Sequence, residues 1–115
     1  MPNRHLVKPL KHLGHYASAT EAEYAYHLEL LKRTSQIVDY RYEPMSLRLA
    51  KKTRYTPDFM VIFEDHIELH EVKGFWRDDA RVKIKVTAEQ FPWFKFIAVQ
   101  KQPKRQGGGW KYEEF

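Results

Sequence analysis

The fold is decided by residues 55–73, which read YTPDFMVIFEDHIELHEVK. In the first half of this stretch, residues 59–63 are all apolar, so a strand here would have apolar side chains on both faces, as expected at the centre of a sheet. A tight turn at Glu64-Asp65 follows, and apolar and polar residues then alternate, which predicts a second strand. The pattern therefore predicts an antiparallel hairpin that pairs residues 55–63 with residues 66–73.

The turn also predicts which residues face each other in this hairpin. Paired residue numbers sum to 129, so Ile62 meets Ile67 and, by the same rule, Asp58 meets Glu71. Directly opposed residues have Cβ atoms about 5 Å apart, and like charges in such a pair destabilise a sheet. Something cationic should therefore compensate. A hard divalent metal with oxygen ligands would do so, and Lys73, on the same strand face as Glu71, would do so in part.

A helix is expected to begin near Ser18 or Thr20 and to end near Thr34-Ser35. Both starting residues are good N-caps, and each is followed three residues later by a glutamate, so two capping boxes overlap. Further along, an apolar stripe at helical spacing marks the face that should pack on the sheet.

Two glutamates, Glu21 and Glu23, compete for a place on the buried face of this helix. On an ideal helix Glu21 lies within about 20° of Leu28 on the apolar stripe, and Glu23 points about 160° away from Glu21. Glu21 is therefore the better candidate for the side that faces the sheet. Its alternative role is that of the acid in a capping box, and a shifted helix start would favour Glu23.

The other elements complete an α/β layer. Residues 79–91 fit either strand or helix periodicity, and we favour a helix because Asp78-Asp79 and Glu89-Gln90 are poor strand formers. The order helix, three strands, helix, strand is typical of an α/β domain with a mixed sheet. We expect one domain over residues 1–115, with a basic arm at 1–17, strands at 40–49 (broken at Pro44), 54–63, 67–72 and 94–99, and a basic, Gly-containing tail at 101–115.

Composition narrows the functional classes. The 115 residues include no cysteine, which excludes a disulfide framework, a thiolate zinc site and a cysteine nucleophile. No apolar run approaches the length of a membrane span, and the first residues lack the apolar core of a signal peptide, so we expect an intracellular protein without membrane partners.

The net charge of +5 is concentrated at the two ends of the chain. Residues 1–15 carry +3, residues 101–111 carry +4 and residues 113–114 carry −2, so residues 16–100 are neutral overall. Basic ends around a neutral body favour contact with a phosphate backbone, and their alternative role is that of solvated tails.

The converging acids suggest a chemistry. Three carboxylates, from Glu21, Asp58 and Glu71, together with the ammonium of Lys73 suit phosphodiester hydrolysis with Mg²⁺, with Mn²⁺ as an alternative. Lys73 would orient the attacking water or stabilise charge in the transition state. The backbone carbonyl of Val72 is a candidate further ligand.

Pro57-Asp58, followed by Glu71-Val72-Lys73, resembles the signature of the PD-(D/E)XK nuclease superfamily. The likeness extends over about residues 15–100 to small phage endonucleases related to Holliday-junction resolvases. The stretches that carry it are Ser18-Ala19-Thr20-Glu21-Ala22-Glu23-Tyr24, Tyr42-Glu43-Pro44, Tyr55-Thr56-Pro57-Asp58-Phe59, Glu71-Val72-Lys73-Gly74-Phe75 and Phe91-Pro92.

This resemblance implies a restriction-endonuclease-like αβββαβ core and a symmetric dimer that cuts branched or otherwise structured DNA. It implies that Glu21, Asp58 and Glu71 ligate the metal and that Lys73 is the catalytic lysine. It places the basic run of Arg81, Lys83 and Lys85 toward DNA, and if the protein is phage-encoded it places it in the cytoplasm of a bacterial host. The alternative function is that of a DNA-binding or assembly module that has the same fold and does not cleave.

Overall fold

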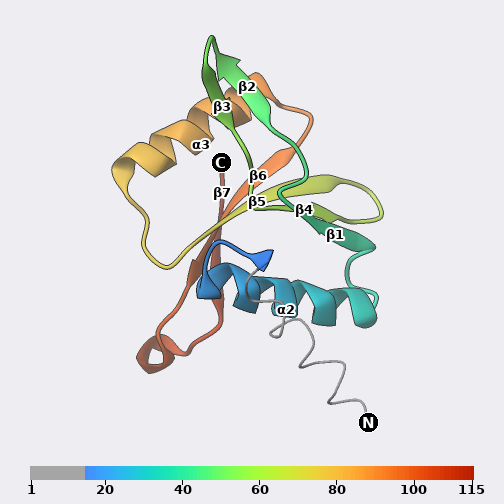
Figure 1. Ribbon diagram of the computed structural model, residues 1–115. Coiled ribbons are helices and arrows are strands. Elements are labelled where there is room, and N and C mark those ends of the chain that lie inside the picture. The colour runs from blue at the N-terminus through green and yellow to red at the C-terminus, as the bar shows by residue number, and fades with distance from the viewer. Residues whose placement is uncertain (1–14) are drawn as a thin grey trace.

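The computed structural model describes residues 15–115, so most of the expected basic arm at residues 1–17 lies outside the described residues. A five-stranded mixed sheet in the order β1-β4-β5-β6-β7 forms the centre, and β2 and β3 form a separate hairpin (Figure 1). The elements are α2 (Ala19–Arg33), β1 (Asp39–Tyr42), β2 (Leu47–Ala50), β3 (Thr53–Tyr55), β4 (Phe59–Ile62), β5 (Ile67–Lys73), α3 (Asp78–Gln90), β6 (Lys95–Lys101), the 3₁₀ turn η2 (Lys104–Gln106) and β7 (Trp110–Glu114).

Helix α2 begins and ends where the sequence predicts. Ser18 is the N-cap, and its side chain accepts a hydrogen bond of 3.1 Å from the backbone N–H of Glu21. Thr34 is the C-cap. The helix lies along one face of the sheet (Figure 1), and Tyr24 and Leu28 are fully buried there.

The predicted register of the central hairpin is confirmed. Strands β4 and β5 are antiparallel, with Ile62 opposite Ile67 and Met60 opposite Leu69. In all four pairs of this ladder the two residue numbers sum to 129, as predicted. The short turn at residues 64–65 sets this register, because a slip by one residue would move the apolar set to the wrong face.

The expected break of the 40–49 strand at Pro44 is confirmed, and the strands on its two sides belong to different sheets. The expected single strand at 54–63 is wrong, because it also divides into two strands of different sheets. β1 and β4 lie in the main sheet, whereas β2 and β3 pair only with each other. Proline explains both divisions: Pro44 and Pro57 have no N–H to donate to a strand ladder. Asp58 accordingly lies just before β4 and not within a strand.

The second half of the chain forms a parallel crossover. Helix α3 confirms the helix that was favoured for residues 79–91, and it connects β5 to β6, which run parallel. The segment assigned to a C-terminal tail adds an element that the sequence analysis did not predict. Strand β7 pairs antiparallel with β6 and forms an edge of the sheet.

The sheet separates two apolar cores. One lies between the sheet and α2, and the other lies on the opposite face, where α3 and the β2–β3 hairpin pack. Between residues 15 and 115 there is no helix long and apolar enough to cross a membrane. The first core includes Tyr24, Leu28, Phe59, Val61 and Val99, and the second includes Leu47, Tyr55, Leu69, Ile84 and Phe96.

Candidate active site

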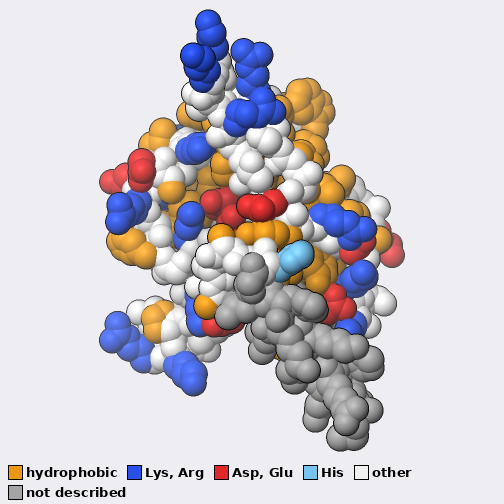
Figure 2. All heavy atoms as spheres, in the orientation of Figure 1, with side chains coloured by type: hydrophobic (Ala, Val, Ile, Leu, Met, Phe, Trp, Pro, Cys, Tyr) orange, Lys and Arg blue, Asp and Glu red, His pale blue; other side chains and the backbone are white. Residues whose placement is uncertain are grey.

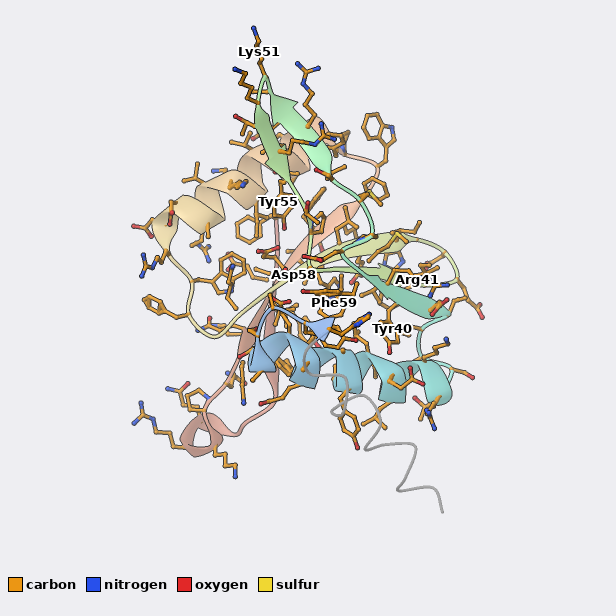
Figure 3. All side chains as sticks on the ribbon, viewed as in Figure 1. Tyr40, Arg41, Lys51, Tyr55, Asp58 and Phe59 are labelled. Atoms are coloured by element: carbon orange, nitrogen blue, oxygen red, sulfur yellow. The ribbon has the colours of Figure 1, made fainter. Side chains whose placement is uncertain are left out.

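Asp58 lies at the junction of the main sheet, α2 and the base of the β2–β3 hairpin (Figure 3). Its carboxylate accepts a hydrogen bond of 2.8 Å from the backbone N–H of Val72, near the end of β5. Its carbonyl oxygen accepts a second bond of 2.8 Å from the N–H of Glu43, which follows β1. Hydrogen bonds from β5 and from the residue after β1 therefore hold Asp58 on both sides.

Glu71, which is part of β5, lies beside Asp58, and the Glu71 side chain is only 12% exposed. The hydroxyl of Tyr55 donates a hydrogen bond of 2.7 Å to Glu71 Oε1. The ammonium of Lys73 lies 3.4 Å from Glu71 Oε2, and the Lys73 side chain is 41% exposed. One oxygen of Glu71 thus meets a tyrosine from the hairpin, and the other meets the lysine two residues along the same strand.

The third acid reaches the site from the first turn of α2. Glu21 is 9% exposed, and Tyr42 Oη donates a hydrogen bond of 2.7 Å to its Oε1. Tyr42 is itself held by the N–H of Ala17, which donates to the hydroxyl at 3.1 Å. Glu23 instead points outward and forms an ion pair of 2.7 Å with Lys101. Of the two candidate glutamates, the structure turns Glu21 inward.

The pKa values of Asp58 and Glu71 are both raised, and neighbouring acids contribute to each shift. Burial, followed by the charges of Glu71 and Glu21, raises the pKa of Asp58 to about 8, although the Val72 N–H opposes the shift. Burial also raises the pKa of Glu71, with the charge of Glu21 adding to it, against the lowering effects of Tyr55 and Lys73. Burial and the neighbouring acids therefore favour the protonated form of Asp58 at neutral pH when no cation is bound.

The donor chemistry fits a divalent cation, since carboxylate oxygens are the ligands that Mg²⁺ prefers. The described hydrogen bonds use one oxygen of Glu21 and one of Asp58. Within residues 15–115, however, no three His, Asp or Glu side chains stand arranged to hold a metal ion. Each of the three acids is turned toward its own donor, from Tyr42, Val72 or Tyr55. A cation would have to bring the remaining carboxylate oxygens together while these donors hold the others.

The three basic residues expected to face DNA have different surroundings. Lys83 lies over the ring of Tyr55, with its Nζ 5.7 Å from the ring centroid, and so lies next to the acids. Arg81 forms a bidentate pair with Glu113, at 2.6 and 2.8 Å, and lies over the ring of Phe115. Lys85 is exposed on α3. Lys83 is the one of the three that contacts the site.

Tyr42 and Tyr55 are the site residues that the sequence analysis missed. Both lie within the stretches that carry the family resemblance, but no role was assigned to either. The available signal was their position: Tyr55 precedes Asp58 by three residues, and Tyr42 directly precedes Glu43-Pro44, where the chain leaves the main sheet. A hydroxyl placed near a cluster of acids is a natural donor to a buried carboxylate.

No match to this chain was found among family models, curated proteins or solved structures.

Proposed function

We propose that this protein is a Mg²⁺-dependent DNA endonuclease with a restriction-endonuclease-like core. The observation that carries the proposal is the convergence of three acids from three separate elements beside one lysine. Glu21 comes from α2, Asp58 precedes β4 and Glu71 lies on β5. Raising the pKa of a buried acid costs stability, and such strain is concentrated at functional sites.

The element order supports the same fold assignment. Without the β2–β3 hairpin, the chain runs α2, β1, β4, β5, α3, β6, which is the αβββαβ order that the resemblance implies. The parallel β5–β6 pair joined by α3 places Glu71 and Lys73 near the end of a central strand. Side chains at the carboxyl ends of such strands commonly form the sites of α/β proteins.

In this proposal Glu21, Asp58, Glu71 and the Val72 carbonyl hold the cation. When bound, it supplies Lewis-acid polarisation of a phosphoryl oxygen and lowers the pKa of the attacking water. The half-exposed ammonium of Lys73 orients that water or stabilises the charge that develops on the phosphate. Tyr42 and Tyr55 keep the carboxylates oriented, as the hydrogen-bond partners of metal ligands do.

Branched or otherwise structured DNA is the proposed substrate, cut by a homodimer, because paired cuts related by two-fold symmetry need two active sites. The alternative, a DNA-binding or assembly module without cleavage, draws support from one observation. The acids of the described residues do not stand ready as a metal site. The two functions differ in a single measurable property, namely strand scission.

The deciding experiment compares nicking of supercoiled plasmid and cleavage of a four-way junction in Mg²⁺, Mn²⁺ and EDTA. We expect metal-dependent cleavage that is lost in Asp58→Ala and in Lys73→Ala. Asp65→Ala is the matched control, because Asp65 lies in the exposed β4–β5 turn. Calorimetry of Mn²⁺ binding gives a readout that is independent of activity. We expect Mn²⁺ binding to be lost in Asp58→Ala and retained in Asp65→Ala.

Two results would overturn the proposal. Cleavage that survives both Asp58→Ala and Lys73→Ala would reject the site. A wild-type protein that binds junctions and never cuts any substrate would establish the binding module instead.

A further inference from the structure

The β2–β3 hairpin is a strongly basic projection of the described chain. Residues 46–56 contain Arg48, Lys51, Lys52 and Arg54 and no acid. All four side chains are exposed. Figure 2 shows Lys and Arg crowded at the projecting tip, and Figure 3 places Lys51 at its end. The neutral average over residues 16–100 concealed this local charge.

The hairpin has two unlike faces. Leu47 and Tyr55 are paired across the strands and buried in the second core. Arg48 and Arg54 form the next pair and project from the opposite, exposed face. The core side explains how the ribbon is anchored, but it leaves the outer face without a structural role.

The outer face carries an electrostatic cost that the fold does not offset. Like charges directly across a strand pair are destabilising. Within residues 15–115, the ion pairs engage other cations, such as Arg33, Arg81 and Lys101, and none engages the four cations of the hairpin. Arg54 is instead held by Ser46, which accepts bonds of 2.8 and 3.1 Å from its guanidinium. A ribbon of fixed shape with unneutralised cations is suited to a polyanion.

The hairpin rises directly from the candidate site. Tyr55, at its base, donates to Glu71, and Asp58 follows three residues later. Lys51 at the tip is seven positions before Asp58, so the backbone of the tip lies at most about 23 Å from that of Asp58 at strand rise. A ligand that touches both must be extended. A two-stranded ribbon also has the right size to enter the major groove of B-DNA.

We propose that the β2–β3 hairpin is a finger that binds duplex DNA next to the position where the strand is cut. This inference rests on the proposed endonuclease function, and it assigns the four cations to backbone phosphates. The exposed strand residues of the hairpin are Arg48, Ala50, Thr53 and Arg54, so they include no aromatic side chain for base stacking. Phosphate contacts of this kind fix the position of the protein along the duplex and carry no sequence information.

The test is the salt dependence of binding to a labelled 25-bp duplex, measured by fluorescence anisotropy in EDTA so that no cleavage occurs. The test variants are Lys51→Gln/Lys52→Gln and Arg48→Gln. The matched control, Lys32→Gln/Arg33→Gln, removes two exposed charges from the last turn of α2, which lies on the opposite side of the molecule from the hairpin in Figure 1. Each lost phosphate contact reduces the slope of log K against log salt by about 0.9.

We expect the hairpin double variant to reduce the slope by about 2 and Arg48→Gln by about 1, while the control keeps the wild-type slope. Wild-type slopes in both hairpin variants would overturn the finger. An equal loss in the α2 control would also overturn it, since the effect would then be one of net charge. A preference for single strands over duplex that the hairpin variants abolish would refute duplex DNA as the ligand.

Nicking of plasmid in Mg²⁺, run in parallel, separates this proposal from the endonuclease function. Reduced salt slopes in the hairpin variants without any wild-type nicking would support the finger and refute the endonuclease function. Metal-dependent nicking by the wild type with unchanged salt slopes in the hairpin variants would support the endonuclease function and refute the finger.

Discussion

The backbone N–H of Val72 donates a hydrogen bond of 2.8 Å to the carboxylate of Asp58, fourteen residues earlier in the chain. This bond extends the β4–β5 register by one step beyond the last paired residues, Phe59 and His70. It holds one acid beside another, Glu71, although the two repel. The register of an ordinary hairpin thus brings together two acids whose proximity stability alone would not favour.

Asp58→Asn should stabilise the protein in metal-free buffer at pH 8. The native pKa of Asp58, about 8, lies above its ordinary value, so the native state binds the proton more tightly than the unfolded state does. The group therefore stabilises the fold at low pH, and that contribution is lost as pH rises from about 4 to 8. Asparagine keeps the acceptor for Val72 and carries no charge.

Thermal melting in EDTA at pH 5 and pH 8 checks this prediction. We expect the melting temperature of Asp58→Asn to exceed that of the wild type by at least about 4 °C at pH 8, corresponding to about 1 kcal/mol, and by less at pH 5. Asp65→Asn serves as the control in the exposed turn. A variant that is less stable than the wild type at pH 8 would contradict the assignment of a strained acid.

Glu21→Gln and Glu23→Gln should separate the site from the helix surface. Glu21 is buried and held by Tyr42, whereas Glu23 is exposed and paired with Lys101. We expect cleavage to fall by at least about 100-fold in Glu21→Gln, because even the hydrogen-bond partners of metal ligands cost about 10- to 100-fold. Glu23→Gln should cleave like the wild type. Plasmid nicking rates measure this difference. A greater loss in Glu23→Gln than in Glu21→Gln would place the metal ligand on the other face of α2.

The parts of the fold that sequence could predict are those set by local rules. The Glu64-Asp65 turn determines which residues of β4 and β5 face each other, and Ser18 with Glu21 marks the start of α2. These features depend on turn length and capping, so neighbouring residues contain the whole signal.

The parts that were missed depend on distant contacts. β-like residues continue on both sides of Pro57-Asp58, so periodicity alone joined β3 to β4. Strand β7 follows three glycines and alternates weakly, and its pairing with β6 decides its structure. The positions of the acids followed from the register, whereas their donors, Tyr42 and Tyr55, come from elements whose placement in space the sequence did not reveal.

Tyr55→Phe should impair cleavage through Glu71. The Tyr55 hydroxyl lowers the pKa of Glu71 against the raising effect of burial, so its loss makes the carboxylate harder to ionise. We expect nicking to fall by about 10- to 100-fold and the acidic limb of its pH profile to move to higher pH. Tyr40→Phe is the control, because Tyr40 makes a similar bond of 2.8 Å to Glu29, away from the site. Equal pH profiles for Tyr55→Phe and wild type would show that the hydroxyl has only a structural role.

Tyr24→Phe should destabilise the first core and leave cleavage unchanged. His70 is 4% exposed, and burial lowers its pKa, so the ring is neutral. Its Nε2–H donates to Glu68 at 2.8 Å, which leaves Nδ1 to accept the Tyr24 hydroxyl at 2.7 Å. Removing that hydroxyl leaves a buried acceptor unpaired, at a cost of about 1–3 kcal/mol.

Urea unfolding at pH 7.5 measures this loss, with Tyr26→Phe on the same helix as the control, for which we expect a change within about 0.5 kcal/mol. Because the native pKa of His70 lies below its unfolded value, its contribution to stability is fully present above about pH 6.5 and is lost as pH falls. From pH 7.5 to pH 5 the contribution of His70 to stability should therefore decline, while that of Asp58 changes in the opposite direction. In His70→Leu the part of this decline that comes from His70 should be absent, and a pH dependence identical to that of the wild type would mean that the neutral imidazole does not contribute to it.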